Sequence, residues 1–222
     1  MKSAAQQSVV PLFAIAVLCA APASAAVVLD RIAVVVGKHV IKTSDIDRDL
    51  RVTAFLNGQR LQTTSEAKRQ SAERLIDQEI IRQEIIRGSY RRPPESQAEA
   101  LEQQLIRDRF NGSAASLRRA LTQYSLTEDQ LRSQLIWQMT VLQFIDERFR
   151  AGVYVSDQEV RDYYDQHLAE LRKQYRGDSS FDALKEKVRE LLQGERINAN
   201  FSIWLQEART RSHIEYKQEA FA

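Results

Sequence analysis

Helix-start motifs followed by apolar stripes constrain this sequence most. Residues 63–66 (Thr-x-x-Glu), 127–130 (Thr-x-x-Gln) and 156–159 (Ser-x-x-Glu) match the capping box, in which two side chains satisfy free backbone N–H groups at a helix start. Behind each motif, apolar residues recur at steps of three and four, the period of one helix face. After residue 25 the only prolines are Pro93 and Pro94, so few positions forbid a helix. The sequence therefore predicts a mainly α-helical protein.

Glycine, asparagine and proline divide this pattern into segments. In the segment that begins at Thr127, a stripe of residues at helical spacing is expected to fill one side of a core: Leu131, Leu135, Gln138, Leu142, Ile145 and Phe149. The expected helices span residues 43–57, 63–87, 95–110, 117–124, 127–150, 156–168 and 181–205.

A small β element precedes the first helix. Residues 31–36 form a β-branched run, and Gly37-Lys38 then separates it from residues 39–41, which predicts a hairpin with glycine at its first turn position. A lone hairpin is marginal in water. Residues 213–216 alternate like a strand, so we expect them to complete a small sheet where the two ends of the mature chain meet. The alternative is that residues 213–222 are a frayed tail.

The first 25 residues are typical of an export signal. Lys2 gives a positive start, residues 9–20 form a short apolar run, and residues 23–25 (Ala-Ser-Ala) form a cleavage site, with cleavage expected after Ala25. One domain, residues 26–222, would remain. It would contain no thiol, because Cys19 lies in the signal, and no segment of it is long and apolar enough for a transmembrane helix.

Charge and chemistry exclude several function classes. The mature chain has 31 basic and 30 acidic residues, so a nucleic-acid-binding role is not expected. His39, His167 and His213 stand far apart and match no metal spacing. The acidic residues of segment 45–49 resemble the start of a calcium loop, but Leu50 stands where that loop needs glycine, so a capped helix start is favoured. No catalytic residue, metal or cofactor is therefore predicted.

Three segments together resemble the SurA family of exported chaperones and peptidyl-prolyl isomerases. Residues 29–47 (LDRIAVVVGKHVIKTSDID) are similar to the family's opening hairpin and first helix, and residues 155–164 (VSDQEVRDYY) to the helix start that precedes its isomerase domain. Residues 181–216 are similar to its C-terminal helix and strand, which fold back onto the N-terminal part. The resemblance implies a multi-helix chaperone domain of the SurA N-terminal type.

The chain departs from the family's pattern at one place. Isomerase members hold a parvulin domain of roughly a hundred residues before the C-terminal helix, which is an ordinary domain size. Here only residues 172–180 fill that gap, so no isomerase residue can be carried over. The resemblance then implies a chaperone core without the enzyme.

The resemblance to SurA-family chaperones implies an ATP-independent periplasmic holdase. Such a protein binds unfolded or nascent exported proteins, outer-membrane proteins among them, in an apolar cleft. Weak contacts that each bury a little apolar surface would carry the binding. The candidate contacts are aromatic residues that their helices' core stripes leave over: Phe55, Tyr90, Trp137, and Tyr163 or Tyr164.

Two alternatives stay open. The chain would be a structural or assembly subunit if its helices pair with a fixed partner or with a second copy in a homo-oligomer. It would be an enzyme if isomerase activity persists without the parvulin domain or if its residues carry a chemistry that no motif marks. In the first case it would accelerate proline-limited refolding.

Overall fold

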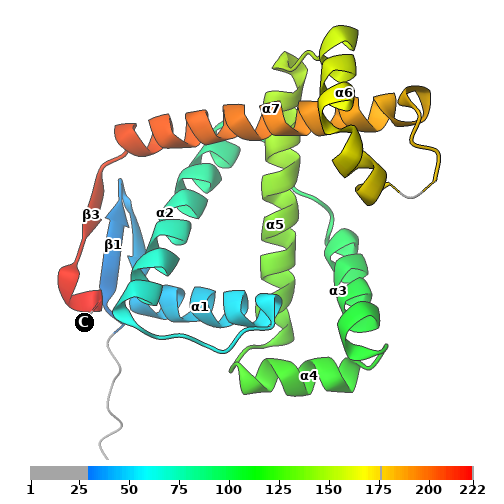
Figure 1. Ribbon diagram of the computed structural model, residues 1–222. Helices are drawn as coiled ribbons and strands as arrows, with labels where there is room; N and C mark the ends of the chain where they lie inside the picture. Colours follow the sequence, from blue (N-terminus) through cyan, green and yellow to red (C-terminus); the bar gives the residue numbers. More distant parts are fainter. Residues whose placement is uncertain (1–29, 176, 222) are drawn as a thin grey trace, which may run out of the picture.

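The computed structural model describes residues 30–175 and 177–221, so the expected cleavage site after Ala25 lies outside the described residues. The described part is mainly helical, with one small sheet at one side (Figure 1). In chain order its main elements are β1 (Ile32–Val36), β2 (His39–Lys42), α1 (Thr43–Asn57), α2 (Ser65–Arg87), α3 (Glu95–Phe110), α4 (Ala114–Gln123), α5 (Glu128–Phe149), α6 (Asp157–Gln174), α7 (Phe181–Arg211) and β3 (Ile214–Tyr216).

The sheet joins the two ends of the described chain. β1 is its central strand and pairs antiparallel with both neighbours, in the order β2-β1-β3. Gly37 has a φ of 61°, which suits glycine in the tight turn between β1 and β2. The expected third strand is therefore confirmed, and residues 214–216 are not a frayed tail.

One face of the sheet is packed against α1 and α2. Val34, Val36 and Ile41 point to this face and are buried together with Ile46 of α1 and Ile76 of α2. Side chains of a strand alternate between faces, so the intervening Val35 and Val40 point away from this core. Burial of one face explains why so short a sheet is stable here.

Two of the three capping boxes form as predicted, and one does not. At Thr127 and Ser156 both reciprocal bonds of the box are present. α2 instead begins one residue later than expected, because the Thr64 hydroxyl accepts from Ala67 N at 3.2 Å. With Thr64 as the cap, Glu66 falls one position short of the third helical residue, and the box predicted from Thr63 is wrong.

The buried stripe of α5 also differs from the prediction. Leu131 and Leu135 are buried as expected, but Leu142 is 67% exposed, and Thr140 and Phe144 are buried instead. The first half of α5 packs in a cluster with α3 and α4, whereas Phe144 packs against α2 and α7. The buried face of α5 shifts along its length because its packing partners change.

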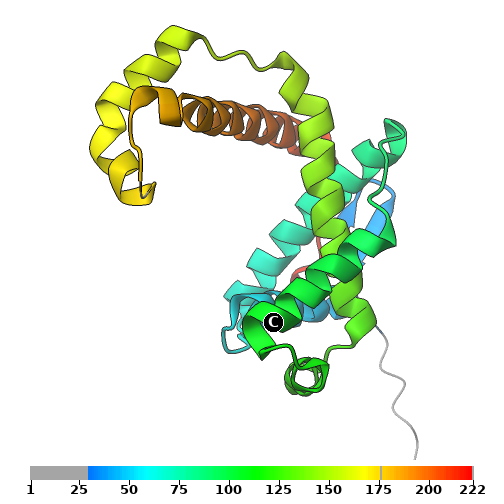
Figure 2. The same ribbon diagram turned by 90° about the vertical axis from the view of Figure 1, so that its right-hand side faces the viewer.

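α6 and the first half of α7 form a lobe that projects from the rest of the molecule (Figure 2). Val160 and Tyr164 of α6 pack against Leu184 and Val188 of α7. The polar stretch expected at residues 172–180 is shorter than predicted, because α6 continues to Gln174 with a kink at His167. Six residues therefore connect α6 to α7, in place of a further domain.

The second half of α7 returns to the sheet and is fixed to α2. The guanidinium of Arg209 pairs with both Glu73 and Asp77. Tyr216 of β3 donates a hydrogen bond from its hydroxyl to Glu73 Oε1 at 2.6 Å. Burial, together with this carboxylate, raises the pKa of Tyr216 to about 12.

Candidate functional site

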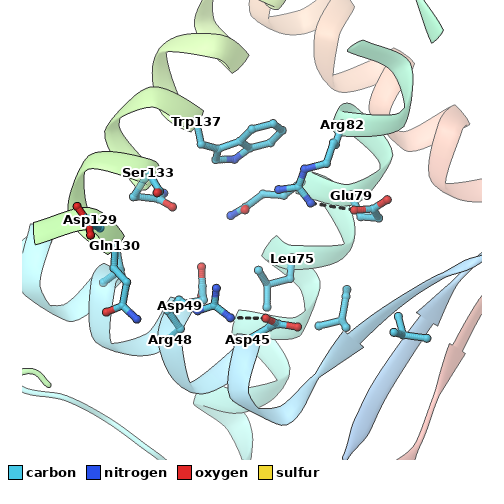
Figure 3. A pocket seen from close by; sticks show the side chains of 15 residues that line it. Asp45, Arg48, Asp49, Leu75, Glu79, Arg82, Asp129, Gln130, Ser133 and Trp137 are labelled. Carbon is cyan, nitrogen blue, oxygen red and sulfur yellow. Dashed lines mark hydrogen bonds and ion pairs between the residues drawn. The ribbon is translucent and has the colours of Figure 1, made fainter. Parts of the chain in front are cut away.

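A cavity of about 400 Å³ lies between α1, α2, α5 and the edge of β2 (Figure 3). β2 and α1 are consecutive in the chain, whereas α2 and α5 come from later segments. It is lined by Val40, Ile41, Asp45, Arg48, Asp49, Val52, Leu75, Gln78, Glu79, Arg82, Asp129, Gln130, Ser133, Gln134 and Trp137. The lining is amphipathic, with apolar groups from every element and charged groups from the three helices.

Trp137 is the largest apolar group of the cavity. Its indole is half-buried, and the guanidinium carbon of Arg82 lies 4.8 Å from the centre of the ring. A cation above an indole face is attracted by the ring's quadrupole, so α2 and α5 are linked across the cavity. Leu75 and Val52 add aliphatic surface, which makes this part suited to an apolar side chain.

A buried carboxylate fixes the position of Arg82. Glu79 is 7% exposed, and its Oε2 accepts from Arg82 Nη1 at 2.9 Å. Its other oxygen accepts from Gln83 Nε2 at 3.1 Å and lies 3.3 Å from His39 Nδ1. A carboxylate at this depth is stable because several donors surround it, and it holds Arg82 over the indole.

A second carboxylate of the cavity lining, that of the half-buried Asp49, joins α1 to α2. Asp49 Oδ2 accepts from the Ser71 hydroxyl at 2.7 Å and from Arg74 Nε at 3.2 Å. Ser71 is fully buried, so this network replaces water at the helix contact. Among the described residues no buried side-chain nitrogen or oxygen lacks a hydrogen-bond partner.

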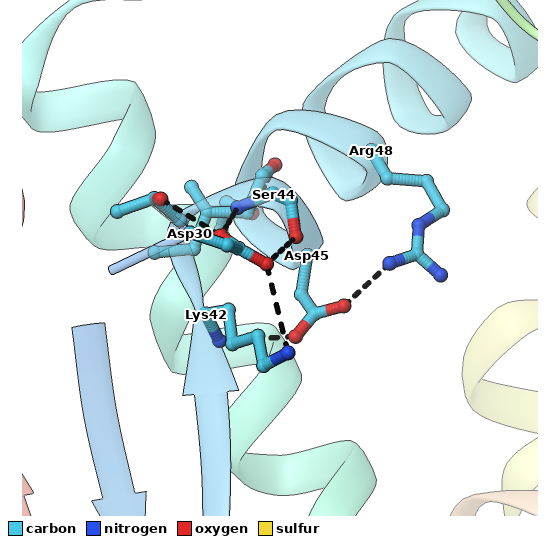
Figure 4. Close-up of polar contacts among 8 residues, drawn as sticks. Asp30, Lys42, Ser44, Asp45 and Arg48 are labelled. Atoms are coloured by element: carbon cyan, nitrogen blue, oxygen red, sulfur yellow. Dashed lines mark hydrogen bonds and ion pairs between the residues drawn. The ribbon is translucent and has the colours of Figure 1, made fainter. Parts of the chain in front are cut away.

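The start of α1 forms the charged rim beside β2 (Figure 4). Asp45 accepts from the backbone N–H of Lys42 at 3.0 Å and pairs with Arg48. Asp30 accepts from the hydroxyl of Ser44 at 2.6 Å, and this bond above all lowers the pKa of Asp30. The acidic run at 45–49 therefore serves as a helix start and an interhelical pair, and in the described part of the chain no group of three or more potential ligands could hold a metal ion.

No protein-family model matches the chain, and no curated protein sequence matches it either. Its fold is similar to a solved structure from work on the virulence factor PEB4 and the periplasmic protein Cj1289, described as two structurally related SurA-like chaperones in Campylobacter jejuni. The match covers 85% of this chain and 99% of the other at a TM-score of 0.53 and 11% sequence identity. The chain has a SurA-like fold. At this identity the likeness concerns the fold alone, and it confirms the expected mainly α architecture with its small sheet.

The SurA-like fold places the five predicted contact residues in different surroundings. Trp137 lines the cavity. Tyr90 is half-buried, with its ring edge-on to Phe144 at 4.9 Å and its hydroxyl accepting from Arg148 Nη1 at 3.1 Å. Phe55 is 2% exposed, between Phe110 and Tyr124. A ring so enclosed is part of the core and does not present a surface for a partner.

The adjacent tyrosines of α6 divide as their helical positions require. Tyr164 is 8% exposed in the core of the lobe, and its hydroxyl donates to the carbonyl of Ser179 at 2.8 Å. Tyr163 is half-buried and stacks on His167 with ring centres 4.0 Å apart. Both lie in the α6–α7 lobe, so neither belongs to the cavity beside Trp137.

The polar residues of the cavity could not be predicted from the sequence. Arg82 and Glu79 occur in a helix rich in charged residues, and nothing in their spacing marks them as a buried pair. Arg48 follows Asp45 at a distance of three residues, which predicts a local ion pair but not a cavity wall. These residues line one cavity only because α1, α2 and α5 are packed around it.

Among the described residues, no helix is both long enough and apolar enough to cross a membrane.

Proposed function

We propose that this protein is a holdase-type chaperone that works without nucleotide, in the periplasm, on unfolded exported polypeptides that include outer-membrane proteins. The observation that carries the proposal is an amphipathic cavity around Trp137 in a SurA-like fold. An apolar wall with polar groups at its rim suits segments of many sequences, because hydrophobic contact is not directional.

The arrangement of the cavity supports weak and reversible binding. Burying an apolar side chain is worth roughly 25 cal/mol per Å², and a single cavity can cover only part of a polypeptide. Association entropy offsets much of this gain. A client would therefore bind weakly and dissociate readily, which suits transfer to a later folding step without ATP hydrolysis.

The mutual pairing of the charged groups also supports the proposal. Each carboxylate of the lining is paired with an arginine, Asp45 with Arg48 and Glu79 with Arg82 inside the lining. The other two, Asp49 and Asp129, pair with Arg74 and Arg132 outside it, so the cavity presents no large field of one sign. Such a surface selects a client by apolar content more than by charge. We also propose that the protein is not an enzyme. Only six residues connect α6 to α7, where isomerase members of the SurA family hold their parvulin domain.

An aggregation assay tests the proposed function. A denatured exported β-barrel protein is diluted into buffer with and without the mature chain, and light scattering is followed without added nucleotide. We expect the mature chain to suppress scattering in proportion to its concentration. Unchanged scattering would overturn the proposal and favour a fixed partner, which would co-purify with the protein in one stoichiometric complex.

A matched pair of variants locates the activity. Trp137→Ser removes the indole from the cavity, whereas Tyr154→Ser removes an aromatic ring that is 78% exposed and lies outside it. We expect only Trp137→Ser to reduce suppression of scattering. Equal loss in both variants would place client binding outside the cavity, and thermal unfolding of each variant shows that the comparison is made between folded proteins.

A further inference from the structure

The edge of β2 that borders the cavity carries backbone groups directed outward. Lys217 N donates to Ala33 O, and Gly37 N donates to His213 O, each at 2.8 Å. Successive residues of a strand direct their backbone N–H and C=O groups to opposite sides. Ala33 and Gly37 both bond toward β3, so Val35, which lies midway between them, also directs its backbone groups toward β3. Val35 therefore directs its backbone groups away from β2.

Val40 is the residue of β2 that stands opposite Val35. In an antiparallel pair of strands, two residues that stand opposite each other either bond to each other through their backbone groups or both direct those groups away from the partner strand. The N–H and C=O of Val40 thus face the free edge of the sheet. No hydrogen bond outside the sheet involves either group within the described residues, and Val40 is 46% exposed.

From this geometry we infer that a client segment binds in extended form, as a fourth strand paired antiparallel with β2 at Val40. The inference rests on the proposed function and names the conformation and charge pattern of the client. An unpaired strand edge is a template for another strand, and main-chain bonds make such binding tolerant of sequence. Val40 and Ile41 also line the cavity, so neighbouring side chains of the added segment would reach its apolar wall.

The charges of β2 decide which occupant fits. Lys38 and Lys42 lie two residues on either side of Val40 and are both exposed. Lys42 Nζ lies 3.8 Å from Asp30 Oδ2, an ion pair open enough to water for a second carboxylate to approach. If two copies paired through β2, centred on Val40, each Lys38 would lie opposite a Lys42, and like charges directly opposite destabilise a strand pair. A segment with an acidic residue two positions on either side of its central residue meets opposite charges instead.

The added strand is expected to be short. Lys42 N–H already donates to the carboxylate of Asp45 at 3.0 Å, so the main-chain bonds are concentrated at Val40. Affinity then depends on the pair of bonds at Val40, the two flanking lysines and apolar contacts with the cavity. A segment of about five residues spans this edge at the usual strand rise.

A peptide binding experiment tests the inference. The probe is a fluorescent, acetylated and amidated peptide of sequence Glu-Val-Val-Val-Glu, measured by anisotropy against the mature chain. Its two controls are the peptide methylated at the central backbone nitrogen, and Lys-Val-Val-Val-Lys. We expect each control to bind about tenfold more weakly, because one loses a main-chain bond and the other places like charges together.

Protein variants provide the reciprocal test. Val40→Pro removes the outward N–H but no bond to β1, and proline is tolerated at such an edge position. We expect it to bind the acidic peptide about tenfold more weakly. Val40→Thr keeps the backbone groups and should bind within about twofold of the original. Lys38→Glu should reduce the preference for acidic over basic ends.

The outcomes separate this inference from the proposed function. If the methylated and unmethylated peptides bind the unaltered protein equally, strand addition at Val40 is overturned whatever the variants do. The same holds if the chain forms a dimer that Val40→Pro dissociates, since a second copy would then occupy the edge. Suppressed aggregation together with either result leaves the proposed function standing, whereas it fails if scattering is unchanged.

Discussion

Tyr216 donates a hydrogen bond to Glu73 Oε1 at 2.6 Å and so joins the last strand of the sheet to α2. The two residues are 143 positions apart in the chain, and the same carboxylate pairs with Arg209 of α7. The contact fixes the returning end of α7 and places β3 beside β1. It thereby supports the sheet whose opposite edge, β2, borders the cavity.

Removing this hydroxyl should destabilise the protein. Tyr216→Phe deletes a bond to a charged group, which is typically worth about 1.5–3 kcal/mol, and leaves the ring in place. Urea unfolding measures the loss. Tyr154→Phe, at a ring that is 78% exposed, is the matched control and should change the free energy of unfolding little. Equal stability of the two variants would show that the bond to Glu73 contributes nothing.

The same tyrosine should make stability depend on alkaline pH. Its pKa is raised from 10.0 to about 12 in the folded protein. A group with a raised folded pKa contributes stability that is complete below its unfolded pKa and is lost as pH rises through the folded one. The difference in unfolding free energy between the original and Tyr216→Phe should therefore shrink between pH 10 and 12. A constant difference would contradict the assigned shift.

The start of α6 should be sensitive to acid. Hydrogen bonds from the Ser156 backbone and from Arg196 lower the pKa of Glu159 from 4.5 to about 2. A lowered folded pKa gives stability that is present above 4.5 and lost as pH falls toward 2. Glu159→Gln should flatten this part of the stability profile, measured by thermal unfolding across that range. An unchanged acid slope would argue against the shift.

The true start of α2 can be tested with two neighbouring threonines. Thr64→Ala removes the hydroxyl that accepts from Ala67 N and should cost about 1 kcal/mol. Thr63→Ala changes the residue before the cap and should cost much less. Chemical unfolding of both variants measures the contrast. A larger loss of unfolding free energy in Thr63→Ala than in Thr64→Ala would indicate that Thr63 is the cap, as the capping-box pattern predicts.

Phe55 should behave as a core residue. It is 2% exposed, and Phe→Ala changes in cores typically cost about 3–5 kcal/mol. We therefore expect Phe55→Ala to lower the unfolding midpoint strongly, as followed by circular dichroism. A stable variant that loses only client binding would instead make Phe55 a direct contact.

Fluorescence can report on the cavity directly. Trp137 and Trp204 are the two tryptophans of the chain, so Trp204→Phe leaves the cavity indole as the sole one. Adding an unfolded client should shift its emission to shorter wavelength, because a bound segment removes water from the ring. Trp137→Phe, which leaves Trp204 in its aromatic cluster, should show no such shift. An emission shift in Trp137→Phe but not in Trp204→Phe would indicate that the client binds beside Trp204 on α7.

The local elements could be predicted from the amino-acid sequence. Capping residues at Thr127 and Ser156, the glycine turn at Gly37 and the apolar period depend on neighbours a few positions away, so they can be recognised without the fold. The third strand could be expected because a two-stranded hairpin needs further support. The mainly helical architecture follows from these local signals together.

Which side chains are buried, and which of them contact one another, depends on how distant segments pack. Phe55 is enclosed by α3 and α4 residues, and the buried face of α5 changes between Leu135 and Phe144 as its partners change. Arg82 of α2 lies over the ring of Trp137 of α5, 55 positions later in the chain, because the two helices border the same cavity. Burial and long-range pairing depend on where distant segments pack, and an amphipathic pattern specifies that a face is covered without specifying what covers it.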